Sequence, residues 1–330
     1  MNEFIFFLNK VIISGATLGS VYALGAVGVT LIFGILRFAH FAHGDMMTLG
    51  AFISFMLVGI FQSLGIQTPL PTGFIVLPFA MAITAGLALG IDKGFYEPLR
   101  AKGVKTVTLL IASIGVTLML QGLIRLFAGT ATRSFFENES KDLFRFKLPI
   151  EGVRSINISE PQILVIVTTI ITVLVLHFFL TRSRIGKGMR AMADNPSLAQ
   201  VSGINTASVV RATWIIAGSL AAMAGTMLAL DVILKPDLAF NIVLPIFAAA
   251  VVGGLGHSYG AIAGGFLIGF AETMSVFNWS IMFRGFDSLP DWFLKDLSLV
   301  PTEHKLTVAF IILVVVLLVR RQGIFKGASS

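Results

Sequence analysis

Long apolar stretches alternate with short polar segments along this chain. The stretches 11–36, 162–180 and 306–319 contain no Asp, Glu, Lys or Arg, and the polar residues collect between such stretches. A run of about 18 or more apolar residues predicts a helix that spans a bilayer. Only helices and closed barrels satisfy the backbone in lipid, and the sequence lacks the alternating segments of about ten residues typical of barrel strands. The pattern therefore predicts an all-α integral membrane protein.

The apolar stretches predict a polytopic bundle of about eight or nine membrane segments within one transmembrane domain, residues 1–330. Glycines at 253–256 and 260 interrupt the segments 240–255 and 258–277. Broken or re-entrant helices are therefore expected there, and whether this pair crosses the bilayer twice is open. The predicted segments are 11–36, 45–62, 72–95, 106–128, 162–180, 208–230, 240–255, 258–277 and 306–319.

Composition supports this class: 56% of the 330 residues are hydrophobic and 12% are charged, against about 25% charged residues in soluble domains. The absence of cysteine excludes disulfides, thiolate metal sites and thiol nucleophiles. The sequence also lacks a P-loop, so the chain is not expected to hydrolyse ATP by that route. Nothing resembles a catalytic triad or a paired-carboxylate site, and no enzyme activity, metal site or bound cofactor is expected.

The net charge of +7 is unevenly distributed between the apolar segments. The segments 97–105 and 181–207 and the tail after 319 carry 10 basic and 2 acidic residues, whereas 129–161 and 278–305 carry 8 basic and 9 acidic residues. The positive-inside rule predicts that the first group is cytoplasmic and the second external. The N-terminus is then outside and the C-terminus inside, which requires an odd number of crossings. The basic excess needs no nucleic-acid partner.

The segment 181–207 contains a complete set of helix boundaries. Asn195 is a suitable N-cap, Pro196 a suitable first helical residue, and Gly203 a suitable left-handed terminator. They predict a short helix over 196–202, which is too short to be stable alone. Two interpretations are open: a helix lying on lipid headgroups, and a docking helix for a cytoplasmic partner. Its shortness and weak apolar face favour docking.

The same segment carries a resemblance to a known family. Residues 186–196 read Gly-Lys-Gly-Met-Arg-Ala-Met-Ala-Asp-Asn-Pro, and with 199 and 203–205 they resemble the coupling loop of ABC-importer permeases of the branched-chain amino acid group. The stretch 31–51 is similar to the early signature of that family, 109–121 to its fourth span and 248–265 to its late glycine-rich motif. The ordered set covers most of 11–320, and Phe-Ala-His-Gly-Asp at 41–45 points to the LivH-type subunit. His257 and Tyr259 depart from the late motif, where small residues or proline are frequent.

The resemblance implies a permease subunit that forms half of the translocation path for branched-chain amino acids or related small polar solutes. Its partners would be a second, LivM-type permease, two cytoplasmic ATPases that use ATP and Mg²⁺, and a periplasmic binding protein, in the inner membrane of a bacterium. The residues expected to couple the chain to the ATPases are Gly186, Arg190, Ala191, Asp194, Asn195, Pro196, Ala199 and Gly203. An alternative is a self-sufficient channel or secondary transporter for a small solute such as urea or an amide, but a channel has no need for a coupling loop.

Polar residues inside membrane segments are functional candidates. Asp45 is expected to cap the second helix, with Gly44 giving the turn its freedom; the alternative is that His43 and Asp45 line the cytoplasmic end of the path. Gln121 and Glu272 suit either the path or an interhelical hydrogen bond. The candidate path residues are His43, Gly44, Asp45, Gln121, Gly254, Gly256 and Glu272. Glycine pairs at 15/19, 86/90, 260/264 and 265/269 are expected to allow close helix packing.

Overall fold

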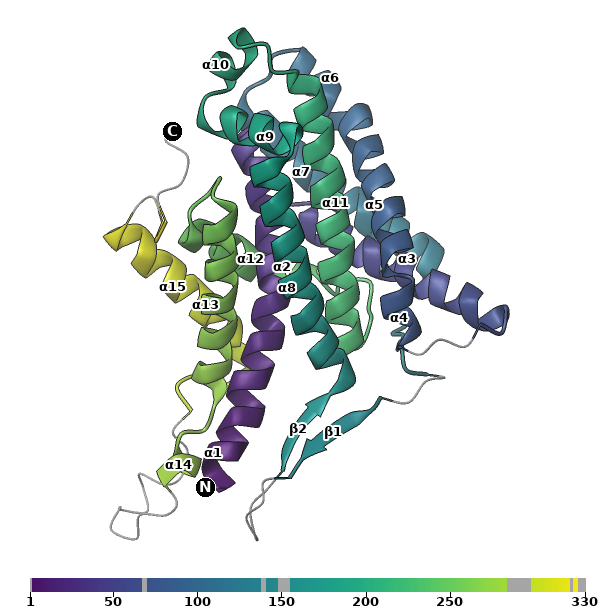
Figure 1. Cartoon of the computed structure of the whole chain (residues 1–330), viewed down its shortest axis with the longest axis vertical. Helices are drawn as coiled ribbons and strands as arrows, with labels where there is room; N and C mark the ends of the chain where they lie inside the picture. The colour runs from purple at the N-terminus through teal and green to yellow at the C-terminus, as the bar shows by residue number, and fades with distance from the viewer. Residues whose placement is uncertain are drawn as a thin grey trace.

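The computed structural model describes residues 2–66, 70–137, 141–147, 155–283, 298–320 and 323–325, and these are overwhelmingly helical (Figure 1). The described part contains seven helices that are long and apolar enough to cross a bilayer. They are Asn2–Leu36, His43–Ser63, Thr106–Ala128, Glu160–Arg182, Thr206–Asp231, Ser258–Val276 and Thr302–Val319. The prediction of an all-α membrane protein with many spans is confirmed.

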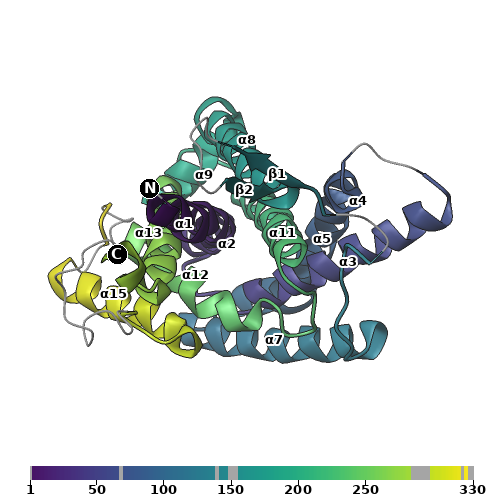
Figure 2. The ribbon, with the colours of Figure 1, turned by 90° about the horizontal axis from the view of Figure 1, so that it is seen from below.

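The first helix lies at the centre of the bundle. It runs without a break from α1 (Asn2–Phe7) through a π-helical turn, η1 (Leu8–Ile13), into α2 (Ser14–Leu36), so its predicted start at residue 11 was too late. Later helices surround it in the view along its axis (Figure 2). Gly15 and Gly19 face Phe270 and Phe266, while Gly265 and Gly269 lie against Ala23 and Gly19. These glycines let α2 and α13 (Ser258–Val276) approach closely, as predicted for the pairs 15/19 and 265/269.

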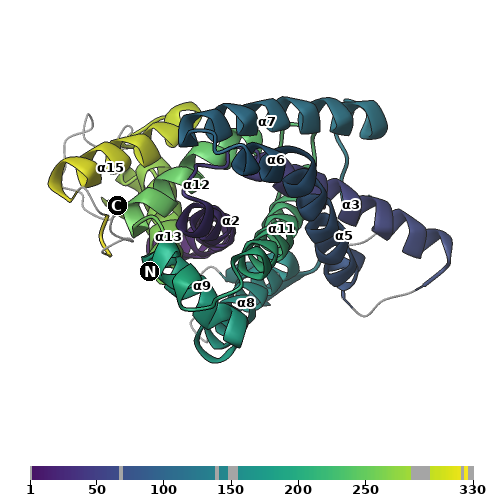
Figure 3. The same cartoon turned by 90° about the horizontal axis from the view of Figure 1, so that it is seen from above.

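The next helices form one side of the bundle: α3 (His43–Ser63), α4 (Thr72–Ile75), α5 (Leu77–Ile91), the π turn η2 (Asp92–Tyr96), α6 (Glu97–Ala101) and α7 (Thr106–Ala128). The predicted segment 72–95 is interrupted at Val76, and the helix then continues to Ala101. Seen from above, α3 and α7 lie lengthwise, inclined to α2 (Figure 3). A Cβ on Gly86 or Gly90 would meet nothing within 4 Å among the described atoms. The packing expected for that pair is therefore not found within the described part of the chain.

A small hairpin precedes the fifth span. The strands β1 (Leu143–Phe146) and β2 (Ile156–Ser159) pair antiparallel, with Leu143 opposite Ser159. The chain then enters α8 (Glu160–Arg182), whose first turn is capped by Gln162: its Oε1 accepts a hydrogen bond from the backbone N–H of Ser159 at 3.1 Å. After two short helices the chain returns in α11 (Thr206–Asp231).

The glycine-rich pair forms two helices that pack against each other in opposite directions. The helix α12 (Phe240–Gly253) has 14 residues, about 21 Å at 1.5 Å per residue, which is shorter than a bilayer core. In the non-helical chain before it, Leu234 pairs with Arg133 near the end of α11, whereas Gly256, just after the helix, lies against Gly34 at the end of α2. The helix α13 then runs back. Close backbone contacts of Gly260 with Gly253 and of Gly264 with Ala249 join the two helices.

The chain ends with α14 (Ser280–Phe283), η3 (Thr302–His304) and α15 (Lys305–Val319). The N-terminus, the hairpin and α14 lie at one end of the molecule, and the segments 97–105 and 181–207 lie at the other (Figure 1). The described tail, 323–325, reaches the second end, where the backbone N–H of Ile324 donates to Val252 at 2.8 Å. The basic segments 97–105 and 181–207 therefore share one end, as their charge predicted, and residues 323–325 of the tail reach it.

Candidate coupling segment and interior polar cluster

Two short helices project from the end that carries the basic segments. In α9 (Arg184–Asp194), Ser183 Oγ accepts from the backbone N–H of Gly186 at 2.8 Å. At the start of α10 (Pro196–Val201), Asn195 Oδ1 accepts a hydrogen bond from the backbone N–H of Leu198 at 3.0 Å. Gly203 has φ of +82°, the left-handed conformation that ends a helix. The predicted caps are confirmed, and the helix ends one residue earlier than expected.

The helix α9 was not predicted from the sequence, although its residues have an amphipathic pattern. Met189 and Met192 face inward, three residues apart, while Lys187 and Arg190 are exposed. Gly186 packs against the carbonyl of Phe179, so α9 lies close on the end of α8. The segment 181–207 is therefore two capped helices rather than a loop with one helix.

The tip of α10 presents apolar side chains outward. Leu198 is 63% exposed and Val201 is 87% exposed, whereas Ala199 faces inward and is 3% exposed. Nothing in the described part of the chain covers these two side chains. We define Leu198 and Val201 as the docking tip.

One hydrogen bond ties the end of α9, just before α10, to α2, and two further bonds lie at the neighbouring ends of α8 and α13. Arg37 has a φ of 57° at the end of α2, and its Nη2 donates to the carbonyl oxygen of Ala193 at the end of α9. His177 Nδ1 on α8 and the Tyr259 hydroxyl on α13 are 2.8 Å apart. His257, which departs from the family motif, caps α13 by accepting from the N–H of Gly260 at 3.2 Å. Arg37 was not assigned a role from sequence because its acceptor lies 156 residues away.

The predicted coupling residues all lie in or beside these two helices. The Ala191 carbonyl accepts from the N–H of Asn195 at 3.0 Å, and Asp194 is exposed. Arg190 is exposed and lines a small cavity of about 40 Å³ with Gly34 and Gly256. The structure brings the set together, and the coupling role remains a prediction.

The connection between α2 and α3 folds into the interior. Phe38, His40 and Ala42 are fully buried. The His40 ring lies 5.3 Å from that of Tyr96 and 5.0 Å from that of Trp214, measured between centroids. Burial, with a smaller contribution from His43, lowers the pKa of His40 well below its usual value, so this ring is neutral at pH 7.

The expected capping role of Asp45 is wrong. The helix α3 begins at His43 after Ala42, no side chain caps it, and the positive φ of this turn belongs to Arg37 rather than to Gly44. Asp45 lies inside the first helical turn, where its side chain is buried close to Gln121 and Thr117 of α7. Both expectations for Gln121, a place in the path and a hydrogen bond between helices, remain predictions.

This interior cluster is rich in polar atoms that lack partners. The ring nitrogens of His40 and His43, the Asp45 Oδ1 atom and the Trp214 Nε1 atom are buried without a hydrogen bond in the described part of the chain. Buried polar groups are normally paired with protein or water. The cluster is thus suited to water or to the polar groups of a solute, and its place in a path remains a prediction.

The remaining path candidates lie elsewhere. The Tyr22 hydroxyl donates to Glu272 Oε2 at 2.9 Å, so Glu272 makes a buried bond between α2 and α13. Gly254 and Gly256, with φ of +106° and +86°, form the turn between α12 and α13, where they lie against Gly323 and Gly34. The seven path candidates therefore occupy three separate places.

These features define a multi-pass α-helical membrane protein with two short capped helices outside its candidate spans. Residues 11–317 match the model of the family described as branched-chain amino acid transport system / permease component, and the chain belongs to this family. It is therefore a transport component rather than an enzyme.

Named relatives cover nearly the whole chain. The high-affinity branched-chain amino acid transport system permease protein LivH of Salmonella typhimurium is 32% identical over 333 residues, which cover 98% of this chain and 96% of the relative. The corresponding permease BraD of Pseudomonas aeruginosa is 30% identical, with coverage of 98% and 97%. The galactose/methyl galactoside import permease MglC of Haemophilus influenzae is 26% identical, with coverage of 87% and 82%. No solved structure matches significantly.

Proposed function

We propose that this chain forms half of the translocation path of an ABC importer for branched-chain amino acids or related small polar solutes. Its similarity to LivH and BraD over almost the full length supports this substrate class. The proposed complex contains a second, LivM-type permease, two ATPase subunits that use ATP and Mg²⁺, and a periplasmic binding protein. The chain itself would bind no nucleotide.

The proposed location is the cytoplasmic membrane of a bacterium, with the docking tip in the cytoplasm. The support is the shared end of the basic segments 97–105 and 181–207, which the positive-inside rule places in the cytoplasm. The N-terminus and the β1–β2 hairpin are then external, on the side of the binding protein.

The exposure of the docking tip is the observation that supports a coupling role for this segment. Two apolar side chains stand exposed on a six-residue helix whose ends are capped and whose base is tied to α2. Burying a Leu or Val side chain fully is worth about 1.5–3 kcal/mol. A rigid, capped helix loses little conformational entropy on binding, so it suits a groove on a partner subunit.

Replacing Val201 with Asp tests the coupling role. Co-expressed with the other subunits, V201D is expected to lose the co-purifying ATPase and the uptake of labelled leucine, because a charge would have to be buried in the interface. The matched control is L299D, since Leu299 is 75% exposed near the other end of the molecule. ATPase retained at wild-type stoichiometry in V201D would show that α10 is not the docking helix.

The substrate class needs a separate measurement. Binding of leucine, isoleucine, valine and urea to the cognate binding protein, followed by uptake of each solute through the assembled complex, tests it directly. We expect uptake of the branched-chain amino acids. Uptake of urea without leucine would overturn the substrate assignment and leave the coupling role intact.

A further inference from the structure

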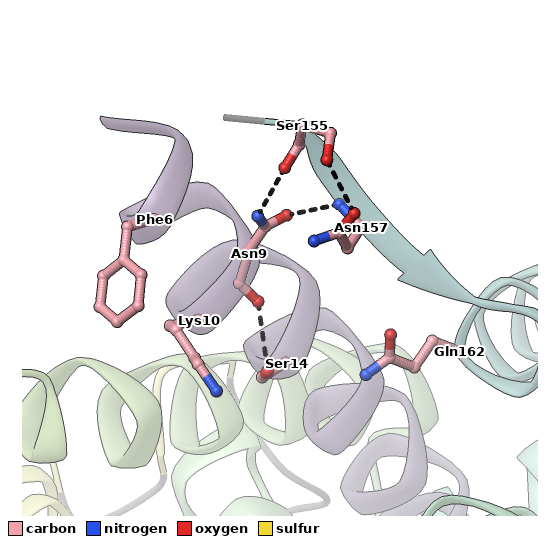
Figure 4. A pocket seen from close by; sticks show the side chains of 7 residues that line it. All are labelled: Phe6, Asn9, Lys10, Ser14, Ser155, Asn157 and Gln162. Atoms are coloured by element: carbon pink, nitrogen blue, oxygen red, sulfur yellow. Dashed lines mark hydrogen bonds between the residues drawn. The ribbon is translucent and has the colours of Figure 1, made fainter. Parts of the chain in front are cut away.

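A pocket of about 500 Å³ opens at the end of the molecule opposite the docking tip. It lies between the π turn η1 and two consecutive elements that are far from η1 in the sequence, the strand β2 and the start of α8 (Figure 4). Its lining residues are Phe6, Asn9, Lys10, Ser14, Ser155, Asn157 and Gln162. The proposed transport function uses none of them.

Asn9 holds the two walls of this pocket together. Its Nδ2 donates to the carbonyl oxygen of Ser155 at 3.3 Å, and its Oδ1 accepts from the backbone N–H of Asn157 at 3.1 Å (Figure 4). A carbonyl only accepts and an N–H only donates, so the orientation of this amide is determined. The π turn, a feature frequent at functional sites, carries both Asn9 and Lys10.

The other amide oxygens at the pocket are engaged by the protein. Gln162 Oε1 accepts from the N–H of Ser159 at 3.1 Å, and Asn157 Oδ1 accepts from Ser155 Oγ at 3.0 Å. Their NH₂ groups, together with the Lys10 amine, remain to donate into the pocket (Figure 4). No carboxylate belongs to the lining residues identified in the described part of the chain. The pocket thus offers one cation and two amide donors, which suits an anion with several oxygens.

The surroundings indicate the depth of the pocket in a bilayer. Phe7 lies 5.4 Å from Phe277 and 5.8 Å from Trp279, measured between ring centroids, and Phe6 lies 6.1 Å from Phe277. Trp side chains are enriched at the level of lipid headgroups, and Trp279 belongs to this cluster. One turn further into the helix, Ile12 is 41% exposed, an apolar surface suited to an acyl chain.

We propose that this pocket binds the phosphate group of a phospholipid headgroup. Lys10 supplies the charge, Gln162 and Asn157 supply hydrogen bonds, and Phe6 forms an apolar wall. A bound phosphate would join the first helix to the hairpin and α8, in addition to the two bonds of Asn9. The carboxylate of a free amino acid could accept the same hydrogen bonds. A lipid phosphate fits better, because the pocket lies at the depth of the headgroups.

The test uses two isosteric substitutions. Gln162→Glu and Asn157→Asp keep the oxygens that accept from Ser159 and Ser155, but they replace both donors with negative charge. Purified with its natural partners in mild detergent, the protein is titrated with phosphatidylglycerol, with inorganic phosphate and with leucine, and its thermal midpoint is followed. Phospholipid retained through purification is counted by mass spectrometry.

We expect phosphatidylglycerol to raise the midpoint of the wild type, and the double variant Q162E/N157D to bind it at least about tenfold more weakly. Lys10→Gln, which removes only an exposed amine, should weaken binding in the same direction and serves if the double variant folds poorly. The controls are K141Q, a charge-matched change outside the pocket, and Q62E near the end of α3; both should behave as the wild type.

Two results would overturn the proposal. Equal retention of phospholipid by the wild type, Q162E/N157D and K10Q would show that the pocket holds no lipid phosphate. Protection by leucine or by inorganic phosphate, with none by phosphatidylglycerol, would assign the pocket to a free anion. Neither result depends on uptake, so both are distinct from a failure of the proposed transport function.

Discussion

The helices α2 and α8 both have 23 residues, yet they occupy opposite environments. The most apolar window of the first helix, Asn2–Leu36, has a mean hydropathy of 1.9 and is 89% buried inside the protein. That of α8 has a mean hydropathy of 2.8 and is 22% buried. The more hydrophobic helix is therefore the more exposed one. In a bilayer, hydrophobicity marks contact with lipid and does not by itself mark the core.

Side-chain size distinguishes the two helices better than hydropathy does. In α2, glycines lie at contacts with other helices: Gly19 faces Phe266, Gly25 faces Ile246 and Gly28 faces His43. In α8, large apolar residues such as Ile170, Leu174 and Phe178 are more than half exposed. Close contact between helix backbones needs small residues, because apolar side chains gain little by leaving lipid.

The largest effect is expected at the central helix. A Cβ at Gly19 would lie 2.8 Å from Phe266 Cδ1 and 3.0 Å from its Cα. The substitution Gly19→Leu should therefore destabilise the protein by about 3 kcal/mol or more, measured as loss of the monodisperse peak in size-exclusion chromatography. Gly86→Leu is the control, since a Cβ there meets nothing within 4 Å. Equal losses in both variants would break the distinction between core and lipid-facing glycines.

A smaller effect is expected when a buried hydrogen bond is removed. Tyr22→Phe leaves Glu272 Oε2 without its donor, at a cost of about 2 kcal/mol. The comparison variant is Tyr259→Phe, which removes a bond to the exposed His177 of α8 and should cost less than about 1 kcal/mol. Thermal midpoints in the same detergent measure both. A larger shift for Tyr259→Phe would contradict the central role of α2.

A third, smaller effect is expected at Arg37, where the end of α2 contacts the end of α9. Arg37→Gln removes the guanidinium that binds the Ala193 carbonyl and should cost about 1 kcal/mol, a local rather than a global effect. The expected signature is faster tryptic cleavage within α9, at Arg184 or Lys187, with an almost unchanged thermal midpoint. Unchanged cleavage rates would show that α8 alone holds α9.

The smallest effect is expected on the exposed face of α8. Leu174 is 52% exposed, and Leu174→Ala should change the free energy of unfolding by no more than about 0.5 kcal/mol. Ile32→Ala on α2, where the side chain is fully buried, is the matched change and should cost about 2 kcal/mol. Similar costs for the two variants would indicate that a second subunit or a lipid packs tightly on α8.

Local signals in the sequence predicted much of the candidate site. Asn195, Pro196 and Gly203 act on neighbours within a few residues, and their caps are found as expected. The position of Asp45 could not be obtained in this way. The chain turns inward at 37–42 because Phe38 and His40 pack against Tyr96 and Trp214, residues distant in sequence. Cap rules describe a helix that starts in solvent, and α3 starts inside the protein.

By itself, the sequence determined the membrane class, most of the spans, the charge difference between the two ends and the short capped helix. Each of these follows from hydropathy, charge or backbone preference within one segment. Only the tertiary structure decided which apolar helix is central, how far α12 crosses, and which polar groups meet. The hydrogen bonds of Tyr22 with Glu272 and of Asn9 with Ser155 join residues 250 and 146 positions apart. Such pairs depend on how helices of similar hydropathy pack. A uniformly apolar sequence pattern does not indicate which helices will be neighbours.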